Sequence, residues 1–366
     1  MLNVQLGTWE TELMSRQIIV AVMTAMTVLL FAPVAVDAQT RAADGTTAQQ
    51  PWTPERTTDG KPDLQGYWTT QTFTPLQRPE HLADKAFYTE EEAAELHAQL
   101  TAVGVDPLAG SAINIDDTEE RSQRLYQDNR DPSYVHYDNS VWLRTDVPKG
   151  LSTRRTSLIT DPPNGRIPPR TAAATARAAA ASAARRQRGD FDGYHTRPLS
   201  ERCYAWPHNG PPMLPPAYND IHQIFQTPDN VVVFTELSNN APRIISLAGG
   251  PTLPDGIRLF PGHSRGHWEG DTLVVESTNF NGRTRFQGAT DALRVVERFT
   301  RVDADTIRYE FTVDDPTTWT RPWSVEIPMI KTEGPMFEFA CHEGNYDIRH
   351  ILEIYRNIEN QESQHP

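Results

Sequence analysis

The sequence predicts a mainly β protein built on an antiparallel up-and-down barrel, with helical and proline-rich segments wrapped around it. From residue 218 onward, short strand-like runs follow one another, with turn residues about every ten positions. Several of these runs alternate apolar and polar residues, as half-buried strands do. The 29 prolines among 366 residues argue against a helical bundle. A meander of this length leaves costly edges unless it closes into a barrel.

The first segment, residues 1–38, has the features of a signal peptide. Arg16 precedes an apolar run at 18–36, and small residues follow up to Ala38, where we expect cleavage. The stretch before Met14 carries no basic residue, so Met14 is the possible true start. The alternative is an uncleaved single-span anchor. With cleavage, the mature chain is periplasmic or secreted and has no stable membrane span.

Two cysteines remain after cleavage, Cys203 and Cys341. In an oxidising compartment two cysteines can pair. The alternative is two separate buried thiols, because nothing in the sequence fixes the distance between them.

The chain divides into regions of different composition. A polar linker with three prolines precedes a long wrapping or capping segment, which holds a first strand and surface helices. The barrel follows and a C-terminal tail ends the chain. The expected boundaries are 39–62 for the linker, 63–217 for the wrapping segment, 218–350 for the barrel and 351–366 for the tail.

Two helices are expected in the wrapping segment. Residues 89–100 begin with Thr89 as N-cap and Glu92 as its capping-box partner. Residues 171–188 are alanine-rich and end in arginines, which is typical of a strong helix former. Because this second helix has almost no large apolar residue, we expect a surface helix or a flexible insertion.

The strands are expected at regular spacing. Residues 63–69 form the first. In the run 306–313 one face carries Ile307, Tyr309, Phe311 and Val313. The remaining strands are expected at 221–227, 231–237, 243–247, 263–268, 272–280, 293–302, 306–313, 323–330 and 336–341.

Gly66 and Trp68 at the first strand resemble the Gly-x-Trp signature of lipocalins. That resemblance implies a lipocalin-like (calycin-like) barrel, with the tryptophan plugging one end. The next strand-rich region comes much later in the chain than it does in compact lipocalins.

Longer motifs resemble an uncharacterised family of secreted bacterial proteins. They include SRGHWEGDTLVVE at 264–276 and ACHEGNY at 340–346. The resemblance implies secretion and supplies no chemistry. His222 and His263 depart from the family pattern, in which an aromatic and a small polar residue are usual. These two departures point to a site that relatives lack.

Histidines are the main candidates for chemistry. His263, Arg265 and His267 share one face of an extended run, and Trp268 lies on the other. Two imidazoles beside a guanidinium suit an anion or a polarised carbonyl, with histidine as acid or base. The alternative is a solvated outer face. Because the two histidines stand more than about 12 Å apart on a strand, a zinc-type site would also need His222 or His342.

Glu297 is the second candidate, because it lies in an otherwise apolar row. Burial of a carboxylate is expensive unless it is paired or functional, and it would raise the pKa. The alternative is a structural salt bridge to an arginine. Glu236 is a weaker candidate at a strand end, and His342 lies just after Cys341 with a strand-end cap as its alternative.

A ligand-contacting set is expected beside these groups. Tyr204, Trp206 and the proline-rich stretch 207–216 could cover an apolar ligand, with core packing as the alternative. Trp268 and Tyr309 complete the set. The sequence has no phosphate loop, Rossmann glycines or Gly-x-Ser-x-Gly, so no organic cofactor is expected. The net charge of −14 argues against a nucleic-acid partner.

These features lead to three hypotheses about function. The first is an exported enzyme that transforms a small apolar or aromatic molecule as a lyase, isomerase or hydrolase. In it, His267 and Glu297 carry protons and Arg265 stabilises negative charge. The second is a non-catalytic small-molecule binding protein. The third is a metal-dependent hydrolase that uses His222, His263, His267 and His342.

Overall fold

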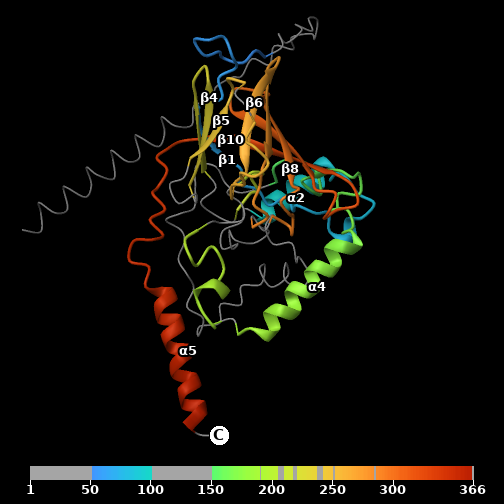
Figure 1. Cartoon of the computed structure of the whole chain (residues 1–366). Helices are drawn as coiled ribbons and strands as arrows, with labels where there is room; N and C mark the ends of the chain where they lie inside the picture. The colour runs from blue at the N-terminus through green and yellow to red at the C-terminus, as the bar shows by residue number, and fades with distance from the viewer. Residues whose placement is uncertain are drawn as a thin grey trace, which may run out of the picture. The chain divides into compact units, whose positions relative to one another are not determined.

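The structure, a computed structural model, describes residues 52–100, 151–189, 191–204, 210–216, 221–236, 242–249, 252–283 and 286–364. These residues are dominated by a ten-stranded β-sheet, nine strands of which close into a barrel (Figure 1). The expected signal peptide and the possible start at Met14 lie outside the described residues. Within them, no helix is long and apolar enough to cross a membrane.

The strands follow the expected runs closely, to within a few residues at each end. Their bounds are β1 Gly66–Thr69, β2 Ile159–Asp161, β3 Ile221–Gln226, β4 Asn230–Thr235, β5 Arg243–Ser246, β6 His263–Glu269, β7 Thr272–Thr278, β8 Arg294–Arg301, β9 Thr306–Asp314 and β10 Trp323–Thr332. The sequence signals missed β2, a three-residue strand on the second side of β10.

Around the barrel the strands lie in the order of the sequence, except for β2, which is not part of the ring. β1 closes the ring, because it pairs with both β3 and β10. The pairings are antiparallel except between β5 and β6, which run parallel through Ser246 and Arg265. The expectation of a purely antiparallel up-and-down barrel is therefore wrong at this pair. β6 therefore starts at the end of the barrel where β5 began.

The expected strand at 336–341 is absent from this described stretch. The reason is topological: β10 already pairs with β9 on one side and with β1 and β2 on the other, so no free edge remains for a further strand. The chain instead passes close to the ring of Tyr67. A Cβ added to Gly334 would lie 2.6 Å from the Cζ atom of this ring.

The two expected helices are confirmed, with α2 at Glu90–Leu100 and α4 at Ala172–Gln187. At α2 the capping box forms in both directions: the Glu92 amide donates to Thr89 Oγ1 at 3.2 Å, and the Thr89 amide donates to Glu92 Oε2 at 2.8 Å. Short 3-10 turns lie at Glu80–Leu82 (η1) and Tyr194–Thr196 (η3).

A further helix, α5 at Asp347–Gln364, takes most of the expected tail. The helices expected from the sequence do not include one over these residues. The signal was present in the sequence, because Ile348, Ile351, Leu352 and Tyr355 recur at helical spacing.

Apolar side chains fill the barrel interior. Alternate residues of β9 and β10 point inward and are buried, among them Tyr309, Phe311 and Trp323. The ring centroids of Phe299 and Tyr309 lie 4.8 Å apart. The interior is thus a packed core along these strands.

The proline-rich stretch contributes to this core. Residues 211–216 are buried, and Met213 and Leu214 belong to the same hydrophobic cluster as the inward strand residues. The described part of the expected cover over a ligand is therefore packed into the protein. Apolar composition explains this, because prolines bring no amide N–H that would need a partner.

Arg301 and Trp68 meet where β8 ends. The guanidinium carbon of Arg301 lies 5.2 Å from the centroid of the Trp68 ring. Trp68 is fully buried and its indole donates to the Leu64 carbonyl at 2.9 Å. A packed tryptophan with a cation on its face therefore occupies this part of the interior.

Candidate functional site

A network of five polar side chains crosses the barrel interior, one from each of five consecutive strands. Each of them stands at an inward position of the alternating pattern. The members are Arg243 of β5, Ser264 of β6, Ser277 of β7, Glu297 of β8 and Tyr309 of β9. We call this set the Arg243 network.

Arg243 and Glu297 form a bidentate ion pair at the centre of the network. Arg243 Nη1 donates to Glu297 Oε1 at 2.8 Å, and Nη2 donates to Oε2. Its remaining contacts go to hydroxyls: Nε donates to Ser264 Oγ at 3.0 Å and Nη2 to Ser277 Oγ at 3.0 Å. The paired fork geometry fixes both groups in one orientation.

Tyr309 joins the network to the buried proline-rich stretch. Its hydroxyl donates to Glu297 Oε1 at 2.8 Å and accepts a hydrogen bond from the Met213 amide at 2.9 Å. Burial, followed by the charge of Glu297, raises the pKa of Tyr309 well above its usual value. The hydroxyl therefore stays protonated and acts as a donor to the carboxylate.

Ion pairing also determines the protonation state of Arg243. Burial by itself would lower the pKa of this guanidinium, but the Glu297 carboxylate outweighs it and raises the pKa. Arg243 is consequently held in its charged form inside the barrel. Of the expected residues, Glu297 and Tyr309 meet here, and the arginine salt bridge left open from the sequence is formed.

Three members of the network were not singled out from the sequence: Arg243, Ser264 and Ser277. The signal that could have found them is strand alternation. Arg243 shares its inward row with Ile245, and Ser277 shares its row with Val275. A polar residue in an inward row is the same signal that identified Glu297.

The expected histidine face lies on the outside of the barrel. His263, Arg265 and His267 alternate with the inward Ser264 and therefore face away from the network. The His267 side chain is 63% exposed, and its Nε2 lies 3.1 Å from Glu269 Oε1. His267 and Glu297 thus stand on opposite faces of the barrel wall and do not form one acid–base centre.

The four-histidine metal centre is not assembled. His222 lies in the interior, His263 and His267 lie on the outer face, and His342 lies in an exposed turn. In the part of the chain that the structure describes, no group of three or more His, Cys, Asp and Glu side chains could hold a metal ion. Strand alternation places His263 and His267 on the outer face, and His342 lies in a turn after β10.

His222 is the buried histidine of the barrel. Its Nδ1 lies 3.0 Å from Thr235 Oγ1, and its Nε2 lies 3.4 Å from Thr70 Oγ1. Burial lowers the pKa of His222 to about 4. The imidazole is therefore neutral near neutral pH, with hydroxyls as its partners.

Protonation of His222 is expected to lower the stability of the folded protein in acid. The unfolded chain takes up the proton near the usual histidine pKa of 6.5, but the folded chain does so only near pH 4, so stability falls as the pH drops through this window. This one group should lower the free energy of unfolding by about 3 kcal/mol below the window. Urea unfolding of wild type and His222→Gln across this range measures the difference.

The exposed His267 provides the control for this measurement. His267→Gln should keep the wild-type pH dependence, whereas His222→Gln should flatten it. Parallel curves for wild type and His222→Gln would contradict the assignment.

The remaining expected residues are dispersed. Trp268 is partly buried against the core, and its indole Nε1 is buried without a hydrogen-bond partner. Glu236 is buried at the end of β4, and its Oε1 accepts from the Phe337 amide at 3.4 Å. Tyr204 is exposed, with its ring edge-on to Phe260 at 5.0 Å. Trp206 lies outside the described residues.

Cys203 and Cys341 form a disulfide, with their Cα atoms 5.5 Å apart. The alternative of two separate thiols is thereby excluded. The bridge ties the segment before β3 to the segment after β10, across a sequence separation of 138 residues. Asn345 Nδ2 lies 2.8 Å from Cys203 Sγ and closes the turn beside the bridge.

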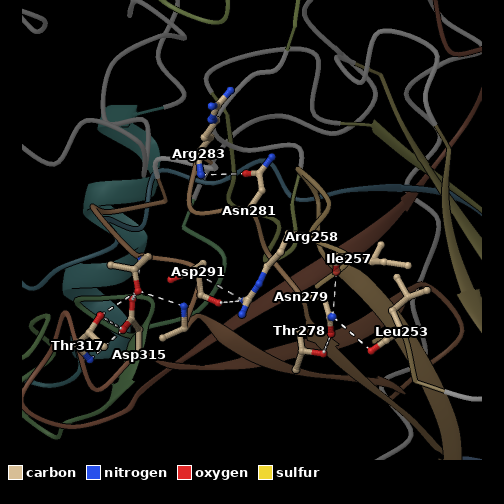
Figure 2. Close-up of polar contacts among 12 residues, drawn as sticks. Leu253, Ile257, Arg258, Thr278, Asn279, Asn281, Arg283, Asp291, Asp315 and Thr317 are labelled. Atoms are coloured by element: carbon tan, nitrogen blue, oxygen red, sulfur yellow. Dashed lines mark hydrogen bonds and ion pairs between the residues drawn. The ribbon is translucent and has the colours of Figure 1, made fainter. Parts of the chain in front are cut away.

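Side chains brace the loops at the barrel end where β7 and β9 finish (Figure 2). Asn279 Nδ2 donates to the carbonyls of Pro254 at 3.2 Å and Ile257 at 3.1 Å. Arg258 Nη1 donates to the Asp291 carbonyl at 2.7 Å, and Asp315 accepts from the Thr317 amide at 2.9 Å. These contacts hold the loops close to the end at which Arg243, Ser264 and Ser277 lie.

Comparison with known proteins adds no relative. No protein-family model, curated protein or solved structure matches this chain. A function for the Arg243 network therefore has to be inferred from the geometry of this chain.

Proposed function

We propose that the protein binds a small, largely apolar molecule in the barrel interior, in contact with the Arg243 network. The observation that carries this proposal is the position of Tyr309. Its hydroxyl connects Glu297 to the Met213 amide, so the buried stretch 211–216 lies directly against the charged network. In the proposal, the ligand takes the place of this stretch.

The chemistry of the network supports a binding role. A buried ion pair adds little net stability, and well-packed apolar residues of similar volume often serve as well or better. Five polar groups converging within an apolar core are therefore poorly explained by stability alone. A few fixed polar groups among apolar and aromatic side chains are typical of small-molecule sites.

Binding is proposed here in preference to acid–base catalysis. The carboxylate of Glu297 accepts two hydrogen bonds from Arg243 and one from Tyr309, so it is engaged on both oxygens. The imidazole proposed as its partner, that of His267, faces outward. Of the two histidines and one glutamate considered for proton transfer, His222 and Glu297 are buried, whereas His267 is exposed.

We also propose that the protein works outside the cytoplasm. The disulfide between Cys203 and Cys341 supports this, because structural disulfides form and persist in oxidising compartments. The apolar run at 18–36 supports it independently.

Weakening the contacts that keep residues 211–216 buried against the Arg243 network should increase the affinity for an apolar ligand. Tyr309→Phe leaves the buried Met213 amide without a partner, which disfavours the inserted state of the stretch by about 1–3 kcal/mol. The fluorescent probe N-phenylnaphthylamine should then bind about tenfold more tightly to Tyr309→Phe than to wild type. Probe titration of the purified full chain, with near-UV circular dichroism to verify the fold, measures this.

The outer wall provides the control for the probe experiment. Ile244 is 59% exposed on β5, so Ile244→Ala should leave probe affinity unchanged. Absence of saturable binding to wild type and Tyr309→Phe alike would overturn the proposal. So would equal affinities for these two proteins.

A further inference from the structure

A second polar site lies outside the barrel network, in the wrapping segment. Here the stretches 75–78 and 156–165 run side by side. The Leu158 amide donates to the Pro75 carbonyl at 2.8 Å, and the Arg78 amide donates to the Gly165 carbonyl at 2.8 Å. Since β2 in the second stretch pairs with β10, the barrel supports this layer.

Arg78 is fixed within the layer and is 3% exposed. Its Nε donates to Thr156 Oγ1 at 2.9 Å, and its Nη1 donates to the Ala83 carbonyl at 3.2 Å. The backbone at Gly165 closes over the guanidinium, because a Cβ there would lie 3.1 Å from Arg78 Cζ. The remaining nitrogen, Nη2, is buried and has no hydrogen-bond partner among the residues that the structure describes.

Arg155 directly precedes Thr156, the residue that binds Arg78 Nε, and so brings a second cation into the same layer. Its guanidinium carbon lies 5.0 Å from the centroid of the Phe87 ring, and its Nη2 donates to the Ile159 carbonyl at 3.5 Å. Its Nε is also buried and has no hydrogen-bond partner in the described part of the chain. Burial, and then the Arg155 cation, lower the pKa of Arg78. Arg155 as a whole is only partly buried.

The charge of this pair is not balanced within the described residues. No carboxylate in them forms an ion pair with Arg78 or Arg155, whereas the neighbouring Arg154 and Arg166 pair with Glu90 and Glu80 at 3.7 and 3.8 Å. Guanidinium groups stay protonated in proteins, so burial does not neutralise them. A buried charge with no counter-charge is strongly unfavourable, and an anion would relieve it.

We propose that Arg78 and Arg155 form a binding site for a divalent tetrahedral oxyanion, either phosphate or sulfate. The unused donors, Arg78 Nη2 and Arg155 Nε, would bind its oxygens. Guanidinium groups match such oxyanions in geometry, and two cations favour a divalent anion over a monocarboxylate. The site is separate from the Arg243 network and does not depend on the function proposed for that network.

Calorimetric titration of the full chain with inorganic phosphate and with sulfate, at constant ionic strength near neutral pH, tests the site. Saturable binding of one anion per chain is expected. Arg155→Gln should weaken this binding by at least about tenfold, as expected for loss of a charge-assisted contact. Arg308→Gln is the matched control: it removes the same charge from the outer face of β9, where Arg308 pairs with Glu310 at 3.3 Å.

Three results would overturn the proposal. One is the absence of saturable binding by either anion. Another is equal affinity in Arg155→Gln and wild type, which would indicate an adventitious ion only. The third is an equal loss in Arg308→Gln, which would indicate a response to net charge. Thermal unfolding of each variant in chloride alone shows that it is folded and keeps these outcomes interpretable.

Discussion

Replacing Glu297 with leucine is expected to lower the free energy of unfolding by about 3–5 kcal/mol at neutral pH. The substitution leaves the Arg243 guanidinium inside the barrel without its carboxylate, and neither serine hydroxyl can balance a full charge. The Arg243 side chain is 10% exposed, so solvent does little to relieve it. Urea unfolding, followed by tryptophan fluorescence, measures the change.

Two further variants separate the charge effect from the loss of packing. The double variant Arg243→Met with Glu297→Leu removes both charges and should regain most of the lost stability, because apolar residues replace buried pairs at little cost. Glu310→Leu, on the outer face of β9, should change stability by less than about 1 kcal/mol. A double variant as unstable as Glu297→Leu would contradict the explanation.

Removal of the disulfide is expected to have an effect of similar size. In the chain-entropy model, a bridge across 138 residues stabilises the folded state by about 5 kcal/mol. Cys203→Ser with Cys341→Ser should therefore unfold at a much lower urea concentration than oxidised wild type. The same measurement on wild type in dithiothreitol should give the value of the double variant.

The control for this measurement is the double serine variant treated with the same reductant. Dithiothreitol should not change the stability of the double serine variant, because no bridge remains to be reduced. If wild type keeps its oxidised stability after complete reduction, the bridge contributes nothing and this prediction is wrong.

Strand alternation predicted most of the barrel because it is a local property of the chain. In β9, the inward residues Ile307, Tyr309, Phe311 and Val313 could be read from the sequence alone, and so could the turn at 303–305. Capping chemistry placed α2 in the same way. Each of these signals lies within about ten residues of sequence.

The closure of the barrel and the relative direction of its strands could not be predicted in the same way, because both depend on segments that are distant in the sequence. β1 pairs with β10 across more than half of the chain, and this pairing removed the edge that a strand at 336–341 would have needed. The parallel course of β6 depends on the connection at 247–262, which has no alternating pattern of its own.

The site was predicted in part for related reasons. Glu297 stood out because a carboxylate in an apolar row is costly wherever the row faces inward. His263, Arg265 and His267 were correctly grouped on one face, but the sequence did not decide whether that face was inside or outside. The structure shows that Ser264, their small neighbour, is the inward residue.

The parallel pair of β5 and β6 has a consequence for how this barrel could vary. A ring of antiparallel neighbours closes only with an even number of strands, so nine strands require a parallel pair somewhere. Here that pair brings the first residue of β5, Arg243, to the same end as Ser264 near the start of β6. An eight- or ten-stranded relative that restored full alternation would carry these two residues to opposite ends. The parallel pairing of β5 with β6 is thus what brings these two members of the Arg243 network together.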